Sequence, residues 1–402
     1  MAQHLFHALT PMPDDPIMGI NQMFQTDPRE GKVNLSIGVF LNEAGKIPLL
    51  EVVEEAEKRL AERRLAHGYL PIEGLAVYRD LVQGLVFGES SPARLDGRIT
   101  TVQTLGGTGA LRIAARFAHD FLGFKRAVVP DPTWGNHIAI LKAAGFEVSA
   151  YPYYDRAAGD AAPEALVASL EALEEPTLIL MHACAHNPTG CDLMCDVWER
   201  VGDILEGKGH LALLDMAYQG FARGIDEDAE AIRMLAARGL NFLASSSSSK
   251  NFGLYGERVG ALHAVCATKQ EAETVLTILK SIVRCEYSCP AEHGARIVAE
   301  VLGDPELSQQ WRQAVDKMRR RVEAMRAELS AALKREGAEI PALDRQKGMF
   351  SFTGLTADEM KTLREEFAVY GVANGRICIA GLNLRNVGPA AHAIAEVLKR
   401  RG

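Results

Sequence analysis

The sequence has no hydrophobic run long enough to cross a bilayer. A membrane-spanning helix needs about 20 consecutive, mostly apolar residues, and no stretch of the 402 residues approaches this. Residues 1–16 contain neither Lys nor Arg, and they lack the apolar core of about 7 residues or more that a secretory signal peptide carries. We therefore expect a cytoplasmic protein.

The sequence also has fewer basic than acidic residues, and its cysteines do not have the paired spacing of metal or redox motifs. The 44 Lys and Arg are outnumbered by 52 Asp and Glu, which argues against nucleic acid as a partner because phosphate binding needs a basic surface. The seven cysteines include no Cys-x-x-Cys pair, so we expect free thiols. Five possible zinc ligands share one segment, but without zinc-site spacing, and we expect no metal there: His182, Cys184, His186, Cys191 and Cys195.

What the sequence does contain is a regular alternation of strands and helices. Its length predicts two or three domains. The expected strands are Arg126–Val129, Glu147–Tyr151, Thr177–Met181, Leu211–Leu214, Asn241–Ala244 and Val259–Val265. The expected helices are Thr108–Phe121, His137–Ala144, Glu164–Glu171, Cys195–Glu206 and Asp228–Ala237. This order predicts an α/β fold whose mostly parallel sheet is covered on both faces.

The C-terminal part follows a different pattern. Residues Glu306–Glu336 predict one long helix with a solvated, charged face and a buried apolar stripe. Shorter elements follow it, and they predict a smaller α/β domain: strands at Met349–Phe352 and Ile377–Ile379, and helices at Asp358–Phe367 and Pro389–Lys399.

Two motifs suit a phosphate group. Gly106-Gly107-Thr108-Gly109 opens an expected helix, where backbone N–H groups can bind an anion, although a plain tight turn is an equal alternative. It is neither a Walker A loop nor a dinucleotide fingerprint, which argues against a nicotinamide dehydrogenase. The run Ser245–Ser249 then ends in Lys250, with Arg258 beyond it. This run is either a flexible linker or a phosphate site beside a Schiff-base lysine.

Other unusual residues also follow expected strands. Asp215 closes a fully apolar strand, where it either caps a turn or pairs with a cation. Trp134 and His137 are either core residues or a stacking plate and a carboxylate partner. Asn187 lies in an Asn-Pro-Thr-Gly turn. Because ligands gather at the carboxyl ends of parallel strands, these groups together predict a pyridoxal 5′-phosphate (PLP) site.

The sequence resembles the class I aspartate and aromatic amino acid aminotransferases, PLP enzymes of fold type I, from about Asp15 to the C-terminus. The motifs that carry the resemblance are Gly-Gly-Thr-Gly-Ala-Leu-Arg (106–112), His-Asn-Pro-Thr-Gly (186–190), Asp215, Ala-Tyr-Gln-Gly-Phe-Ala-Arg-Gly (217–224), Ser-Lys-Asn-Phe-Gly-Leu-Tyr (249–255), Glu-Arg-Val-Gly (257–260) and Gly-Met-Phe-Ser-Phe (348–352).

The resemblance implies a seven-stranded, mostly parallel sheet in a large domain and a smaller α/β domain built from both chain ends. The implied boundaries are 1–46 for an N-terminal arm and part of the small domain, 47–315 for the large PLP-binding domain and 316–402 for the small domain. It also implies a homodimer with shared active sites.

The resemblance further implies the roles of the catalytic residues. Lys250 forms a covalent imine with PLP and shuttles a proton between the substrate Cα and the cofactor. Asp215, supported by His137, keeps the pyridine nitrogen protonated. Tyr218 and Asn187 hydrogen-bond the ring hydroxyl. No metal takes part.

Further residues are implied to hold the cofactor and the substrate. Trp134 stacks on the ring and Tyr69 reaches the phosphate of the partner subunit. The phosphate group is held by Gly107, Thr108, Ser247, Ser249 and Arg258. Substrate is contacted by Gly38, Trp134 and Asn187, by Arg376 at the α-carboxylate, and by Arg284 at a dicarboxylate side chain.

The implied activity is transfer of amino groups between amino acids and 2-oxo acids such as 2-oxoglutarate, with ping-pong kinetics through pyridoxamine phosphate. Leu41, Ile47, Gly68 and Cys289 make the expected pocket margin more apolar than in aspartate-selective relatives, so we expect aspartate, glutamate, phenylalanine and tyrosine as substrates. The alternatives are another fold type I PLP enzyme, a β-lyase or decarboxylase, and a non-catalytic regulator.

Overall fold

The computed structural model describes residues 6, 9–12 and 15–401, so part of the expected N-terminal arm lies outside the described residues. The chain begins with α1 (Pro16–Thr26), β1 (Val33–Asn34), α2 (Glu51–Arg63), α3 (Ala76–Phe87) and α4 (Pro92–Leu95). The alternating part consists of β2 (Ile99–Leu105), α5 (Gly106–Arg116), β3 (Arg126–Asp131), α6 (Gly135–Ala143), β4 (Glu147–Pro152), the hairpin β5 (Tyr154–Asp155) and β6 (Asp160–Ala161), α7 (Pro163–Glu171), β7 (Thr177–His182), α8 (Cys195–Lys208), β8 (Leu211–Met216), α9 (Glu230–Ala237), β9 (Phe242–Ser247) and β10 (Val259–Val265). The last part consists of α10 (Lys269–Glu286), α11 (His293–Gly303), α12 (Pro305–Arg335), β11 (Phe350–Phe352), α13 (Ala357–Phe367), β12 (Val369–Tyr370), β13 (Arg376–Cys378) and α14 (Val387–Lys399).

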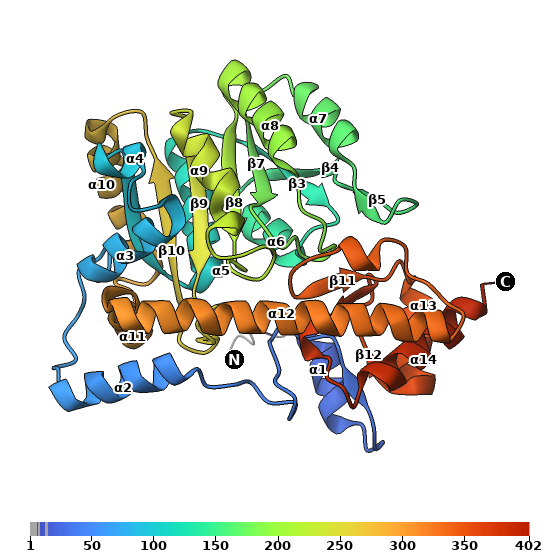
Figure 1. Ribbon diagram of the computed structural model, residues 1–402. Coiled ribbons are helices and arrows are strands. Elements are labelled where there is room, and N and C mark those ends of the chain that lie inside the picture. The colour runs from blue at the N-terminus through green and yellow to red at the C-terminus, as the bar shows by residue number, and fades with distance from the viewer. Residues whose placement is uncertain (1–5, 7–8, 13–14, 402) are drawn as a thin grey trace, which may run out of the picture.

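A seven-stranded sheet forms the centre of the molecule (Figure 1). Its strand order is β2-β10-β9-β8-β7-β3-β4, and only β10 runs antiparallel to its two neighbours. The prediction of a mostly parallel sheet is therefore confirmed. The carboxyl ends of β3, β7, β8 and β9 meet at one edge, which is where parallel α/β sheets bind ligands.

Both faces of this sheet are buried. In β7, Leu178 and Leu180 belong to one apolar cluster, whereas Ile179 and Met181 belong to another. Successive side chains of a strand point to opposite faces, so a strand covered on both faces must be apolar throughout. This explains why the sequence shows continuous apolar runs in place of an apolar–polar alternation.

Most expected elements differ from the observed ones at an end, and three of these differences are instructive. The helix expected over 108–121 ends at Arg116 and continues as a wider π-helical turn, Phe117–Phe121. The helix expected from Asp228 starts with a 3-10 turn, Glu227–Ala229. The strand expected at 241–244 extends to Ser247, because buried hydroxyl partners satisfy its serines.

A smaller group of elements is built from both ends of the chain, as expected. β1 pairs in parallel with β12, and β11 pairs antiparallel with β13. Figure 1 shows these strands with α1, α13 and α14 beside the large sheet. The division at residues 46 and 315 stays a prediction. No helix in the described part of the chain is long and apolar enough to cross a membrane.

Helix α12 confirms the long helix expected from the sequence, and in Figure 1 it runs across the molecule from α11 to α13 and α14. The Asp304 carboxylate caps its start by accepting hydrogen bonds from the backbone N–H groups of Glu306 and Leu307. Trp311 is fully buried, stacks on Phe252 and donates its indole N–H to the carbonyl oxygen of Asn251 over 2.8 Å. The helix is thereby fixed to the residue that follows Lys250.

We predict that replacing Trp311 by Ala lowers the free energy of unfolding by about 3–5 kcal/mol, because it leaves a large cavity and an unpaired carbonyl. Urea unfolding followed by circular dichroism measures this. Lys317→Ala, at an exposed position of the same helix, is the control and should change stability by less than about 0.5 kcal/mol. A loss below about 1 kcal/mol for Trp311→Ala would contradict the anchoring contact.

Candidate active site

A cavity of about 230 Å³ lies at the carboxyl edge of the sheet. It brings together most of the site residues expected from the sequence. Its lining consists of Gly107, Thr108, Leu111, Trp134, His182, Asn187, Asp215, Ala217, Tyr218, Ser247, Ser249, Lys250 and Arg258. These residues come from segments more than 150 positions apart, and the strand ends are what place them side by side.

Asp215 is a buried carboxylate near the end of β8. Its Oδ2 lies 3.0 Å from His137 Nε2, and its Oδ1 accepts a 2.5 Å hydrogen bond from Ser245 Oγ. Burial by itself raises the pKa of Asp215, but the interactions with His137 and Ser245 outweigh it and lower the pKa to about 2. Thr133 Oγ1, 2.8 Å from His137 Nδ1, fixes the imidazole from behind. The carboxylate is therefore ionised and can hold a proton on a facing ring nitrogen.

Lys250 lies in the turn after β9, with its ammonium 4.8 Å from the ring centroid of Tyr218. Burial lowers its pKa to about 8, while the negative charge of Asp215 opposes this shift. Near neutral pH a useful fraction of this amine is therefore unprotonated, as a nucleophile or a general base requires.

Four of the five serines before Lys250 have hydrogen-bonded side chains. Ser245 donates to Asp215, and Ser246 Oγ lies 3.0 Å from His263 Nε2 inside the protein. Ser247 and Ser249 line the cavity, as expected, with their hydroxyls 3.1 Å apart. All five side chains are buried, so the flexible-linker alternative is wrong.

The start of α5 and Arg258, on the same side of the cavity as Ser247, can hold a phosphate. Gly106 has a positive φ of 67°, and a Cβ at this residue would come within 2.8 Å of Arg258 Nη2. Only glycine therefore lets the guanidinium lie against the start of α5. Gly107 and Thr108 form the first turn of that helix, whose N–H groups and dipole favour an anion.

Arg376 lies at the beginning of β13 and is buried. Its Nη1 donates to Asn187 Oδ1 over 3.3 Å, and its Nη2 donates to the Ser36 carbonyl oxygen over 2.5 Å. Its guanidinium carbon lies 4.4 Å from the ring centroid of Phe350. Nε has no partner among the described residues, which leaves donor capacity for a carboxylate.

Two expected site residues, Asn187 and Gly38, lie close to Arg376 or to the Phe350 ring beneath it. Asn187 Nδ2 donates to Tyr218 Oη over 3.4 Å, which connects the amide with the ring-binding tyrosine. Burial raises the pKa of Tyr218, so the phenol keeps its proton and can donate it in a hydrogen bond. At Gly38 a Cβ would come within 2.9 Å of Phe350 Cζ. Glycine is therefore required for the close packing of these two segments.

Some expected residues are not in the cavity. Tyr69 is 98 % exposed, and Arg284 is exposed and hydrogen-bonded to Ser288, which follows the end of its helix α10. Neither lines the cavity within this single chain. The residues of the expected apolar margin are also outside its lining: Leu41, Ile47, Gly68 and Cys289.

Sequence reasoning missed several side chains of the site. His182 ends β7 and lines the cavity, so the strand-end rule that selected Asp215 applied to it as well. Ser245 and Thr133 support the Asp215 cluster through bonds between residues far apart in sequence, for which the sequence gives no signal. Phe350 lay inside a motif but was assigned no role.

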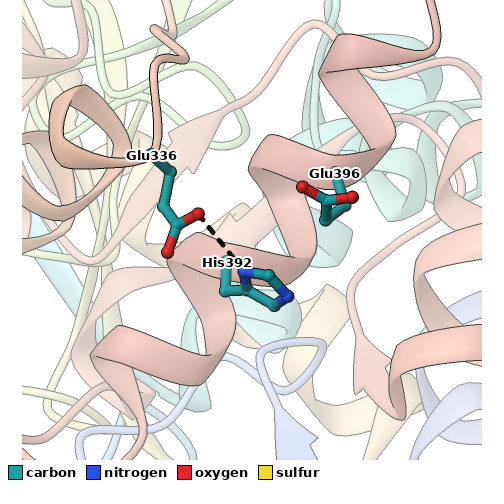
Figure 2. Close-up of side chains that lie close together, drawn as sticks. All are labelled: Glu336, His392 and Glu396. Atoms are coloured by element: carbon teal, nitrogen blue, oxygen red, sulfur yellow. Dashed lines mark hydrogen bonds and ion pairs between the residues drawn. The ribbon is translucent and has the colours of Figure 1, made fainter.

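The structure does not gather the histidines and cysteines of 182–195 into a group of three ligands. Among the described residues, the one such group is Glu336, His392 and Glu396. Figure 2 shows it: His392 and Glu396 share helix α14, and Glu336 approaches from the end of α12 to 3.3 Å from His392 Nδ1. Lys399 Nζ already pairs with Glu396 at 2.9 Å and lies 4.0 Å from Glu336, so an ammonium balances these carboxylates.

The donor set of the cavity fits pyridoxal 5′-phosphate. A helix start, an arginine and three hydroxyl groups face one end, which suits a phosphate dianion. A buried ionised carboxylate suits a protonated ring nitrogen, and the amine of Lys250 suits an aldehyde.

Residues 30–394 match the family model of aminotransferase class I and II. The chain is 47 % identical over 396 residues to an aspartate aminotransferase from Pseudomonas aeruginosa and 47 % identical over 397 residues to an aromatic-amino-acid aminotransferase from Escherichia coli K12; each match covers 98 % of this chain and 100 % of the relative. It also resembles the crystal structure of an aromatic-amino-acid aminotransferase from Burkholderia pseudomallei covalently bound to pyridoxal phosphate, with a TM-score of 0.95, 47 % identity and coverage of 98 % of this chain and 100 % of that one. The fold is thus the expected fold type I, and the chain belongs to the aminotransferase class I and II family, as a pyridoxal-phosphate-dependent aminotransferase.

Proposed function

We propose that this aminotransferase exchanges amino groups between both dicarboxylic and aromatic amino acids and 2-oxo acids such as 2-oxoglutarate. One observation carries the proposal: a buried amine, Lys250, shares one cavity with a buried carboxylate, Asp215, while Asn187 joins that cavity to the guanidinium of Arg376. The arrangement provides a base for the substrate Cα and a cation for its carboxylate.

Two residues handle the protons of the reaction. Bound PLP supplies an electrophilic aldehyde and an electron-withdrawing ring. Asp215 holds a proton at the ring nitrogen, because its own pKa of about 2 keeps it anionic. Lys250 Nζ accepts the proton from the substrate Cα and returns it to the cofactor, as its lowered pKa permits.

The other residues of the site hold the cofactor and the substrate and orient them. Arg258, Ser247, Ser249 and the first turn of α5 bind the phosphate, and Trp134 covers the ring. Arg376 binds the α-carboxylate with its free donor capacity, and the side chain of Asn187 keeps the guanidinium aligned. Alignment of this kind lowers the entropy cost of reaching the reactive geometry.

Dual specificity is supported by the two curated relatives, one an aspartate aminotransferase and one an aromatic-amino-acid aminotransferase at the same 47 % identity. We assign the side-chain carboxylate of dicarboxylic substrates to Arg284, and the apolar margin to residues such as Leu41 and Cys289. Because Arg284 and Tyr69 lie outside the cavity of their own chain, the assignment requires a homodimer in which each completes the partner's site. All seven cysteines have free thiols, which supports a cytoplasmic location.

We predict that Lys250→Ala, supplied with PLP, loses at least about 1,000-fold in transamination, because no other group replaces the general base. Absorbance follows the half-reaction: in the parent enzyme, glutamate should shift a band near ~360–430 nm to ~330 nm. Lys142→Ala, at an exposed position of α6, is the control. A Lys250→Ala variant with more than about a tenth of the parent rate would exclude this role, and lyase or decarboxylase products would favour the alternatives.

The pKa of Lys250 predicts a pH dependence for cofactor attachment. Only the neutral amine attacks an aldehyde, so the attachment rate of apoprotein should rise with pH and level off above about 8, the lowered pKa of Lys250. Since Asp215 raises that pKa, Asp215→Asn should move the midpoint to lower pH. Stopped-flow absorbance over a pH series measures both, and an unchanged or higher midpoint in Asp215→Asn would contradict the coupling.

Arg284 should control one substrate class and not the other. We predict that Arg284→Ala lowers kcat/KM for aspartate and glutamate by about 100-fold, the equivalent of a lost charge-assisted contact. Phenylalanine and tyrosine should change by less than about 3-fold. Steady-state kinetics on the four amino acids measure this, with Arg284→Lys as a charge-retaining control. An equal loss on all four would reject the assignment, and a parent enzyme inactive on both aromatic substrates would reject dual specificity.

A further inference from the structure

Arg326 is an arginine in the middle of α12 that the sequence presents as one of many charged helix residues. Only two arginines in the described part of the chain are almost fully buried, Arg326 and Arg376. Neither belongs to the cavity lining, but Arg376 is hydrogen-bonded to Asn187 of that lining and is the proposed carboxylate-binding residue, whereas Arg326 has no contact with the lining of that kind. A buried guanidinium is costly unless its donors are satisfied, so its contacts indicate why it is retained.

The hydrogen bonds of Arg326 all go to one short segment, residues 348–351. Nη2 donates to the carbonyl oxygens of Gly348 and, over 3.4 Å, of Phe350, and Nε donates to Ser351 Oγ over 3.3 Å. None of these acceptors is a carboxylate. Burial lowers the pKa of Arg326 to about 10, so the side chain is still a cation at neutral pH. It acts as a rigid fork of donors that fixes the backbone of β11 on α12.

Strand β11 holds Arg376 in two ways. In the β11–β13 pair, Phe352 lies opposite Arg376 and Phe350 lies opposite Cys378, so the ladder sets where β13 begins. The ring of Phe350 also stacks under the guanidinium of Arg376 at 4.4 Å, and it meets the ring of Tyr218 edge-on at 5.5 Å. A shift of β11 would therefore move Arg376 and, at the same time, the Phe350 ring on which its guanidinium stacks.

The same segment supports the loop that carries Asn187. The backbone N–H of Lys347 donates to the carbonyl oxygen of Gly190 over 2.6 Å. At Gly190 a Cβ would come within 2.8 Å of the Phe350 carbonyl oxygen, and at Gly348 a Cβ would come within 2.6 Å of Ala185 Cβ. Two glycines thus allow the backbones to meet directly, and residues 347–351 lie between α12 and both partners of the Arg376–Asn187 hydrogen bond.

We propose that Arg326 is a positioning residue for substrate carboxylate binding: through β11 it sets the position of Arg376 and Asn187 without touching the substrate. The inference rests on the proposed function, since it assumes that Arg376 binds the α-carboxylate. Lys250 and Asp215 are held by other elements, so the cofactor end of the site depends less on Arg326 than the carboxylate end, which β11 supports directly.

The test separates carboxylate binding from the cofactor site in the PLP-loaded enzyme. The probe is 3-phenylpropanoate, which has one carboxylate and a phenyl ring but no amino group to react. For Arg326→Met we expect calorimetry to show an about ten-fold higher Kd for the probe, and kinetics an about ten-fold higher KM for phenylalanine, because a small displacement of a binding group has effects of this size or larger. The kcat and the cofactor absorbance should change much less than the affinity for the probe, with at most a small shift in the pH titration of the cofactor, because Arg376 also acts on the pKa of Lys250.

Three further variants make the result decisive. Arg320→Met makes the same change at an exposed position of the same helix and should leave Kd unchanged. Arg326→Lys should recover part of the affinity. Ser351→Ala removes one hydrogen-bond acceptor of Arg326 with little change in volume and should raise the Kd of the probe about 3-fold. If Arg326→Met does not fold, Ser351→Ala and Arg326→Lys test the inference in its place.

Arg376→Met distinguishes failure of the inference from failure of the proposed function. If it leaves Kd unchanged, the proposed role of Arg376 is wrong. If Arg376→Met weakens binding while Arg326→Met binds the probe like the parent, the inference about Arg326 is overturned. Where Arg326→Met does not fold, parent-like binding by Arg326→Lys and Ser351→Ala overturns it. A loss of probe binding that comes with an equal disturbance of the cofactor absorbance would also overturn it, because that is the pattern of general destabilisation.

Discussion

The site depends on keeping one carboxylate ionised inside the protein. Asp215 lies near the end of β8, the central strand of the sheet, where burial alone raises its pKa. His137 and Ser245 prevent this with two short contacts, and Thr133 holds His137 in turn. These side chains come from β8, α6, β9 and the loop after β3, so four neighbouring segments must reach the same point. The ionised carboxylate therefore depends on the way in which the fold brings the ends of β3, β8 and β9 to the same edge of the sheet.

That charge also acts on the lysine. Burial favours the neutral amine of Lys250, the carboxylate of Asp215 favours the ammonium, and the cations Arg258 and Arg376 favour the amine again. The resulting pKa of about 8 is a balance among the groups that also bind the ring, the phosphate and the substrate. A substitution at any of these positions is therefore expected to change the basicity of Lys250 as well as binding.

The sequence predicted the parts of the site that follow from local pattern. Asp215, Asn187 and Lys250 were found because polar residues directly after apolar strands are unusual, and the family resemblance supplied their roles. The bonds of Ser245 and Thr133 escaped prediction because they join segments that only the folded sheet brings together. Arg326 escaped it because a charged residue in a charge-rich helix indicates solvent exposure, whereas the observed side chain lies beside the buried Met325 and Leu329. Tyr69 and Arg284 act, by the proposal, across a chain boundary.

Helix α12 fixes the distance between two parts of the active site. Trp311 attaches it to the carbonyl oxygen next to Lys250, and Arg326 attaches it to the strand beside Arg376. The two residues are 15 positions apart, which corresponds to about 22 Å of helix axis. Inserting or deleting one residue in this interval would rotate one attachment relative to the other by about 100° and detach one of them. Substitutions at the exposed positions of α12 should therefore disturb the site less than a change in the number of residues between its two anchors.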